Sequence, residues 1–301
     1  MHPSRPRLSI AATRASAFTF CAALLLSCAG CGGNATQTRS LRLGGAQIPL
    51  EFVQGWLERS REPAFNVSRA EPVYLSQNGF RALARGDCDI ACTDRPLVAS
   101  ELEQFGENPP IGRRVGFYGY ALYVNDANRI DSIFSGHIEL LFKRRILDWG
   151  ELGGDAGAIT LLGPGKGTRG GALLARQAGV WFSEPTWIAL ESDAAVIQRV
   201  REDPLALGFA GVGLDGDGVR YLGLRMERRG EPVFPSIEAI EQDRYGLAKV
   251  IYVYWREPAS VAVNTAVSYL FSEAGQAALQ RTDIWPIPAD RSAVEPPAPL
   301  E

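Results

Sequence analysis

The stretch that decides the fold covers residues 158–180 and reads AITLLGPGKGTRGGALLARQAGV. It begins with an apolar run suited to a buried strand, which ends at the glycine-rich segment GPGKGT, residues 163–168. The apolar residues that follow recur at helical spacing: Ala172, Leu173, Ala175 and Ala178. The pattern predicts a strand, a glycine-rich turn and a helix.

The start of such a helix is a place where an anion can bind. Its first N–H groups have no partner within the helix, and they lie at the positive end of the helix dipole. Lys166 and Thr168 add a positive charge and a hydroxyl to this turn. Glycine-rich turns also occur without any ligand, so the motif alone leaves both interpretations open.

The spacing excludes a nucleotide-binding P-loop. That motif needs a glycine, four further residues and then Gly-Lys-Ser/Thr. The residue five positions before Gly165 is Thr160, and Lys166 is followed by Gly167. We therefore predict no ATP site at this turn.

The N-terminus has the composition of an export signal. Residues 1–15 contain three arginines and no acidic residue, and residues 17–27 form an apolar run too short to span a bilayer permanently. This pattern predicts a signal peptide over residues 1–27. Its removal takes away three positive charges, so the net charge of −3 becomes −6. A nucleic-acid partner is therefore not expected, because phosphate backbones need a basic face.

Cys28 is the expected lipidation site. The segment LLS immediately before it resembles a lipoprotein box, which implies cleavage after residue 27 and attachment of lipid to the sulfur. Cys31 is a competing site, and secretion without lipid is the alternative. We expect an exported, membrane-anchored lipoprotein, periplasmic or at the cell surface, with residues 28–39 as its tether.

The remaining cysteines do not predict a metal site. Cys88 and Cys92 are separated by three residues, no histidine lies near them, and His137 is the sole histidine after the signal peptide. We interpret the pair as small buried residues beside a strand, while a disulfide is allowed in an exported protein. No metal or cofactor is predicted.

The chain between tether and tail is long enough for two compact lobes of ordinary size. Long apolar and aromatic runs at residues 115–124 and 250–254 are interpreted as the two crossings between lobes. The boundaries that follow place lobe I at residues 40–120 and 249–290, and lobe II at residues 121–248. Residues 291–301 are rich in proline, lack periodicity and are predicted to be a disordered tail.

Polar or glycine-rich turns end several predicted strands. In the first lobe the strands are expected at residues 41–46, 73–76 and 89–92, followed by turns that contain Gly45, Ser76 and Asp94. Ligands of open α/β sheets bind at the carboxyl ends of the strands. Convergence of these turns with the GPGKGT turn is therefore the predicted geometry of a site.

Several segments, in order, resemble the periplasmic phosphate-binding protein of bacterial ABC phosphate importers. One of them reads SQNGFRALARGDCDIACTDRPL at residues 76–97, and the others cover residues 43–49, 146–154, 165–169, 200–213 and 272–276. The resemblance spans about residues 41–290. It implies an α/β, two-lobed periplasmic-binding-protein-like fold of type II, in which two hinge crossings let the lobes close on one anion.

The resemblance also implies the site residues. Asp94 falls where the family has an aspartate that accepts a proton from hydrogen phosphate. Gln47 stands where the family's first turn has a threonine, and Ser76 and Gln77 occupy its Ser-Ser pair. Gly167 and Thr168 match its Ser-Gly-Thr turn, but Lys166 replaces the serine and Leu162 replaces an arginine four residues earlier. The implied donors are Gln47, Ser76, Gln77, Lys166, Thr168 and the amides of Ile48 and Gly167.

Two features have simpler interpretations that the sequence leaves open. Asp94 could instead pair with Arg95 or cap a turn. The basic run of residues 143–145 is interpreted as a solvated face.

The sequence supports two functional hypotheses. The first is a monomeric, lipid-anchored solute-binding protein that captures an oxyanion, most simply phosphate, and delivers it to an ABC permease. The second is a surface-anchored sensory or interaction module that keeps the scaffold but has lost high-affinity phosphate binding. An enzyme is not expected, because the mature chain has no nucleophile elbow or metal-ligand cluster.

Overall fold

The computed structural model describes most of the chain after residue 38. The described residues are 39–61, 63–71, 75–165, 167–177, 179, 186–279, 284–287, 290, 292–295 and 297. The predicted signal peptide and Cys28 therefore lie outside them. Among the described helices, none is both long enough and apolar enough to cross a membrane.

The first strand group is a mixed sheet with the order β2-β1-β3-β11-β4. Its strands are β1 (Arg39–Gly45), β2 (Phe65–Arg69), β3 (Ile90–Thr93), β4 (Ile111–Asn125) and β11 (Ala248–Trp255). β1 is parallel to both β2 and β3, whereas β11 is antiparallel to β3 and β4. The parallel strands put the ends of β1 and β3 at one edge of the sheet, where the turns after them meet.

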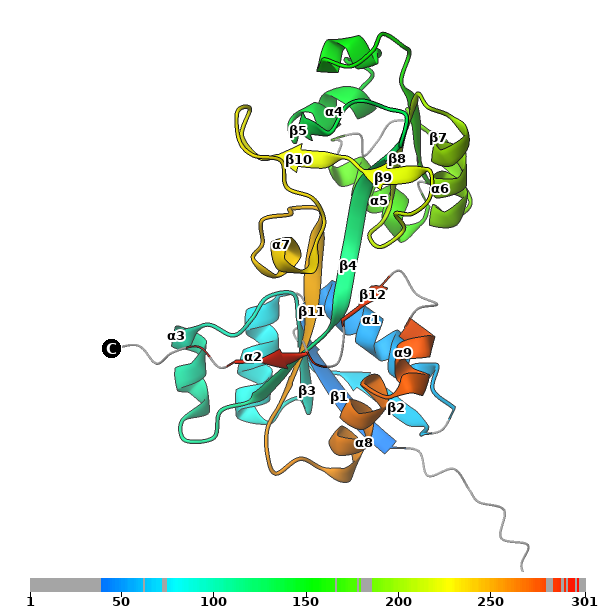
Figure 1. Cartoon of the computed structure of the whole chain (residues 1–301). Coiled ribbons are helices and arrows are strands. Elements are labelled where there is room, and N and C mark those ends of the chain that lie inside the picture. The colour runs from blue at the N-terminus through cyan, green and yellow to red at the C-terminus, as the bar shows by residue number, and fades with distance from the viewer. Residues whose placement is uncertain are drawn as a thin grey trace, which may run out of the picture. The chain divides into compact units, whose positions relative to one another are not determined.

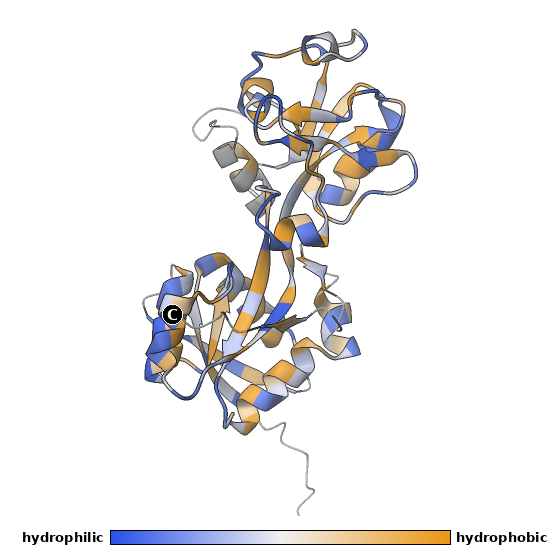
Figure 2. Ribbon diagram, turned by 60° about the vertical axis from the view of Figure 1, so that its left-hand side comes forward, coloured by the Kyte–Doolittle hydropathy of each residue, from blue (hydrophilic) through white to orange (hydrophobic). Residues whose placement is uncertain are grey.

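Helices cover both faces of the first strand group (Figure 1). Alternate residues of β11 separate the two faces, since Ile251 and Val253 belong to the core beneath α1 (Gln47–Glu58) and α8 (Val261–Leu270). Tyr254 points to the other face, where its ring packs edge-on against Phe80 of α2 (Ser76–Arg85) at 5.1 Å between centroids. Figure 2 shows the resulting pattern of hydrophobic strands between helices that are hydrophilic on their outer sides.

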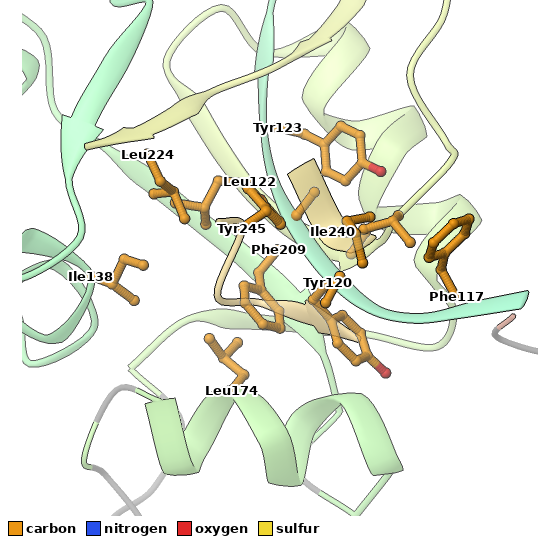
Figure 3. Packing of buried hydrophobic residues seen from close by; sticks show 14 of the residues in the cluster. Phe117, Tyr120, Leu122, Tyr123, Ile138, Leu174, Phe209, Leu224, Ile240 and Tyr245 are labelled. Atoms are coloured by element: carbon orange, nitrogen blue, oxygen red, sulfur yellow. The ribbon is translucent and has the colours of Figure 1, made fainter. Parts of the chain in front are cut away.

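The second strand group shares β4 with the first. Residues 120–125 of β4 pair with β8 (Ala206–Gly211) and β9 (Val219–Tyr221), and β8 continues through β6 (Thr160–Pro164) to β7 (Ile188–Leu190). Gly119, with φ of 146°, is where β4 leaves one set of partners for the other. Tyr120 then stacks on Phe209 of β8 at 4.9 Å, in the core that Figure 3 shows.

The other elements complete the two groups. They are α3 (Ala99–Leu102), η1 (Glu103–Phe105), β5 (Ser132–Phe134), α4 (His137–Phe142), η2 (Trp149–Leu152), α5 (Arg169–Gln177), α6 (Asp193–Glu202), β10 (Gly223–Arg225), α7 (Ile237–Glu241), α9 (Glu273–Leu279), β12 (Ile284–Pro286) and β13 (Ala293–Val294).

The predicted fold class is confirmed, and so is the local prediction for the described part of residues 158–180, which leaves out residues 166, 178 and 180. β6, the turn after it and α5 follow one another as the glycine and apolar pattern indicates. The long aromatic runs are β4 and β11, which pair with each other. The basic run at residues 143–145 is exposed, as a solvated face should be.

Two sequence predictions differ from the structure. Ser76, which the sequence places both at the end of a strand over residues 73–76 and at the opening of a helix, begins α2 and belongs to no strand, and residues 72–74 lie outside the described part of the chain. The strand beside β1 is β2, whose sequence FNVSR exposes most of its side chains and so lacks a clear apolar signal. Within the predicted disordered tail, Ala293 and Val294 pair with β4 as β13.

Cys88 and Cys92 are both free thiols and buried, so the disulfide alternative is wrong. Burial raises the pKa of Cys88 to about 12 and raises that of Cys92 as well.

The thiolate is the reactive form of cysteine. The folded protein should therefore leave both thiols unalkylated by iodoacetamide at pH 8, whereas guanidinium-unfolded protein should be labelled at both positions. Peptide mass mapping checks this, and rapid labelling of either thiol in the folded protein would contradict it.

Candidate functional site

The turn after β1 lies directly against the start of α2. The amide of Ala46 donates to the carbonyl oxygen of Cys92 at 2.9 Å, which ties the turn to the end of β3. Gly79, in the first turn of α2, is packed so closely that a Cβ there would lie 2.6 Å from Cα of Gly45. The starts of α1 and α2 therefore meet at one edge of the first strand group.

Asp94 follows β3 at the same edge and is hydrogen-bonded to Ser76. The hydroxyl of Ser76 donates to Oδ1 of Asp94 at 2.5 Å, and the backbone amide of Asp94 donates back to Oγ of Ser76 at 3.1 Å. Ser76 is buried and Asp94 is half-buried. This reciprocal pair fixes one oxygen of the carboxylate, Oδ1, against the start of α2.

Arg95 forms its ion pair with Glu101, and the pairing of Asp94 with Arg95 that the sequence left open is not found among the described residues. Its guanidinium forms two hydrogen bonds with the carboxylate of Glu101, at 2.6 and 2.8 Å, and lies 5.5 Å from the ring centroid of Phe80. The hydrogen bonds to Glu101 raise the pKa of Arg95, so the guanidinium stays charged and stays paired with Glu101. The turn after β3 is thus held by its own ion pair.

The helix starts at this edge are distinguished by their missing caps. Four described helices have ten or more residues, and of these α6 and α8 begin with serines whose side chains accept a backbone N–H: Ser192 and Ser260. α1 and α2 begin instead after Ala46 and Leu75, with no side-chain cap. The first N–H groups of both helices are therefore left for a ligand or solvent.

The two predicted glutamine ligands are exposed. The side-chain amide of Gln47 donates to Glu51 at 3.0 Å, one turn along α1, and Gln77 lies exposed in the first turn of α2. The backbone amides of Gln47 and Ile48 belong to the uncapped first turn of α1. The first strand group thus brings together five predicted site residues: Gln47, Ile48, Ser76, Gln77 and Asp94.

The turn before α5 carries the remaining predicted residues. The hydroxyl of Thr168 donates to the carbonyl oxygen of Gly165 at 2.7 Å and accepts from the amide of Gly171 at 3.0 Å, so Thr168 caps α5. Gly167 is exposed, with open space where a Cβ would be. Lys166 lies outside the described residues. Unlike α1 and α2, α5 therefore has a side-chain cap, because the Thr168 hydroxyl accepts a backbone N–H of the helix.

Leu162, at the position that the resemblance assigns to an arginine, is fully buried in β6. Its backbone pairs with Ile188 of β7 and Gly208 of β8. The turn after β6 is held in place by neighbouring strands, because the amide of Gly165 donates to the carbonyl of Leu190 at 3.2 Å. Residue 162 therefore offers no guanidinium to an anion, unlike the arginine of the family pattern.

Thr168→Ala is expected to lower the free energy of unfolding by about 1 kcal/mol, because the substitution removes the cap of α5. Urea denaturation measures the loss, and Thr168→Ser should keep most of the stability, since serine offers the same hydroxyl. A protein as stable as the parent but weaker in anion affinity would show that the hydroxyl serves a ligand instead.

Sequence reasoning missed the features that assemble this edge. The contact between Gly79 and Gly45 joins residues 34 positions apart, and the Ser76–Asp94 pair joins residues 18 positions apart. The nonpolar residues before α1 and α2, Ala46 and Leu75, were the available signal, because capped helices prefer serine, threonine or aspartate there.

Among the described residues, no cluster of three or more histidine, cysteine or acidic side chains could hold a metal ion.

The comparisons with known proteins agree with this architecture. A family model described as a PBP superfamily domain matches residues 32–274. No curated protein matches the sequence. An ABC-type phosphate transport receptor from Vibrio cholerae is similar in structure, with a TM-score of 0.52 and 19% identity over 83% of this chain and 100% of that one.

Two further solved structures are similar. A possible phosphate binding protein from Planctomyces limnophilus DSM 3776 has a TM-score of 0.60 and 16% identity, over 84% of this chain and 94% of that one. PstS from Borrelia burgdorferi has a TM-score of 0.53 and 15% identity, over 83% and 100%. At such identities the likeness concerns the fold, and it confirms the resemblance found in the sequence. The chain belongs to the PBP superfamily.

Proposed function

We propose that this protein is a solute-binding protein that captures a protonated oxyanion, most simply phosphate, and delivers it to an ABC permease. The observation that carries the proposal is the pair of uncapped helix starts, α1 and α2, which meet beside the Ser76–Asp94 pair. Uncapped N–H groups attract an anion. A carboxylate among them repels an anion unless a proton lies between the two.

The expected affinity comes from backbone and side-chain donors, without an arginine at residue 162. Hydrogen bonds to a charged group contribute roughly 1.5–3 kcal/mol each, so the loss of one arginine from the family pattern weakens binding about tenfold to a hundredfold. Lys166, outside the described residues, would restore the charge but not the paired geometry of a guanidinium. The ligand would accept hydrogen bonds from the side chains of Gln47, Gln77 and Lys166 and from the amides of Ile48 and Gly167. Ser76 and Thr168 would donate to it only after their hydroxyls turn away from Asp94 and from the carbonyl of Gly165.

The cellular setting in the proposal follows from the N-terminus. Export by the predicted signal peptide and lipid attachment at Cys28 would hold a monomer at the membrane where its permease lies. Lobe I (residues 40–120 and 249–290) and lobe II (residues 121–248) would close over the ligand, and the permease would recognise the closed form. Binding and release involve no chemical step.

Titration calorimetry with phosphate, methylphosphonate and sulfate tests the proposal. Phosphate and methylphosphonate should release or absorb heat with one site per chain at pH 7, and sulfate should bind at least tenfold more weakly, because it brings no proton to Asp94. Thermal unfolding with the same anions provides an independent readout. Absence of heat and of any thermal shift with all three would remove the transport function.

A second candidate is a surface-anchored sensory or interaction module that has lost high-affinity phosphate binding. The observations that favour it are the burial of Leu162 and the commitment of the Thr168 hydroxyl to Gly165. Both reduce the donors that the turn before α5 can offer. Failure of all three anions in the calorimetric test, by a folded protein, would favour this module.

A further inference from the structure

Two basic side chains contact one aromatic ring, Phe134 at the end of β5, and a third belongs to its partner residue in the neighbouring strand. β10 runs parallel to β5, and their register places Arg225 opposite Phe134. The guanidinium of Arg228 lies 5.2 Å from the centroid of the Phe134 ring, and the imidazole of His137 meets the same ring edge-on at 5.6 Å. These residues, here called the His137 cluster, come from β10, the loop after it and the start of α4.

The His137 cluster is not neutralised by acidic residues. In the part of the chain that the structure describes, neither Arg225 nor Arg228 has a carboxylate partner, and Glu139 on α4 is paired with Lys143 instead. Burial lowers the pKa of His137, and the positive charges of Arg228 and Arg225 lower that pKa further. Other basic residues nearby do have acidic partners, as Arg220 does in Asp131 at 3.5 Å.

Two nitrogen atoms of the cluster also lack hydrogen-bond partners. Nδ1 of His137 and Nε of Arg225 are buried and have no hydrogen-bond partner among the described residues. Within the described ranges, the Arg225 guanidinium makes one hydrogen bond, a long one of 3.4 Å from Nη1 to the carbonyl oxygen of Arg228. Buried polar groups without partners are uncommon, and an anion entering between the side chains would supply acceptors.

We propose that His137, Arg225 and Arg228 form a second anion site, separate from the one at α1 and α2, which takes a phosphate group. Arginine pairs recognise phosphate through forked hydrogen bonds, and an imidazole supplies a third donor when it is protonated. The group could be free phosphate or the phosphodiester of an anionic phospholipid, which share this chemistry.

The test uses His137 as its own reporter. Only His2 and His137 are histidines, so in the chain with His2→Gln the imidazole proton signals report on the cluster alone. Titration of these signals by NMR gives the His137 pKa. Added inorganic phosphate should raise it by about one unit, because an adjacent anion favours the protonated ring.

A matched pair of variants identifies the source of the effect. Arg225→Gln should raise the His137 pKa without phosphate, since a neighbouring positive charge is lost, and should abolish the response to phosphate. Arg229→Gln, at an exposed neighbouring arginine outside the cluster, should keep the response. Asp94→Asn should also keep it, which separates this site from the one proposed for transport.

Vesicles distinguish the two sources of phosphate. Co-sedimentation with phosphatidylglycerol vesicles, compared with phosphatidylcholine vesicles, should depend on Arg225 if the ligand is a lipid headgroup. A response to inorganic phosphate alone assigns the site to the free ion, and an Arg225-dependent response to anionic vesicles alone assigns it to the headgroup. The proposal is overturned if neither ligand acts, or if Arg225→Gln responds as the parent does.

Discussion

Gly45→Ala is expected to lower the free energy of unfolding by at least about 4 kcal/mol, a size reached by few single substitutions. Gly45 has a φ of 126°, a conformation that residues with a side chain rarely adopt. A Cβ at this position would lie 2.0 Å from the carbonyl oxygen of Cys92 and 2.9 Å from its carbon. The clash is with backbone of the adjacent strand, so β1 and β3 would have to separate where the site is built.

Gly86→Ala is the matched control for this experiment. Gly86 ends α2 in the left-handed conformation, with φ of 77°, but no atom lies within 4 Å of the position of its Cβ. Its replacement should cost only the conformational penalty of about 1–2 kcal/mol. Urea denaturation of the two variants therefore separates the clash from the backbone strain. Equal losses in both would show that crowding against Cys92 is not what requires a glycine at residue 45.

Sequence reasoning predicted the elements whose signal is local. The strand, turn and helix at residues 158–180 follow from apolar spacing and from glycines within a few residues of one another. β2 was missed because it lies at the edge of the sheet and buries mainly Phe65, so its side chains do not alternate clearly. β13 was missed because only two residues pair with β4, in a stretch whose prolines indicate disorder.

The candidate site was predictable in its residues but not in its hydrogen bonds. Resemblance assigned Ser76 and Asp94 separate roles, as a donor and an acceptor to the ligand, whereas in the structure they bond to each other. Thr168 was also assigned to the ligand, and in this structure its hydroxyl caps α5. A short hydroxyl side chain can reach several acceptors, and which one it chooses depends on tertiary distances that no spacing in the sequence encodes.

Asp94→Asn is expected to reverse the selectivity of the site between phosphate and sulfate, if the proposed function holds. The wild-type carboxylate accepts the proton of hydrogen phosphate and repels sulfate, which has no proton to offer. Asparagine keeps the size of the side chain and an oxygen that can accept from Ser76, but it adds an N–H₂ group that donates to any anion. Phosphate should lose the charge-assisted bond in which the carboxylate accepts its proton, worth roughly 1.5–3 kcal/mol or about tenfold to a hundredfold in affinity.

Sulfate should bind more tightly to the same variant, because the repulsion is removed and a donor takes its place. Ser76→Ala is the informative companion, since it removes the bond that orients the carboxylate but leaves the charge in place. It should weaken phosphate binding without admitting sulfate. Competition calorimetry at pH 7 with the parent and both variants compares the two anions directly. If the ratio of phosphate to sulfate affinity stays the same in Asp94→Asn, a group other than Asp94 distinguishes the protonated anion from the unprotonated one. The Ser76–Asp94 pair would then serve only to join α2 to the end of β3.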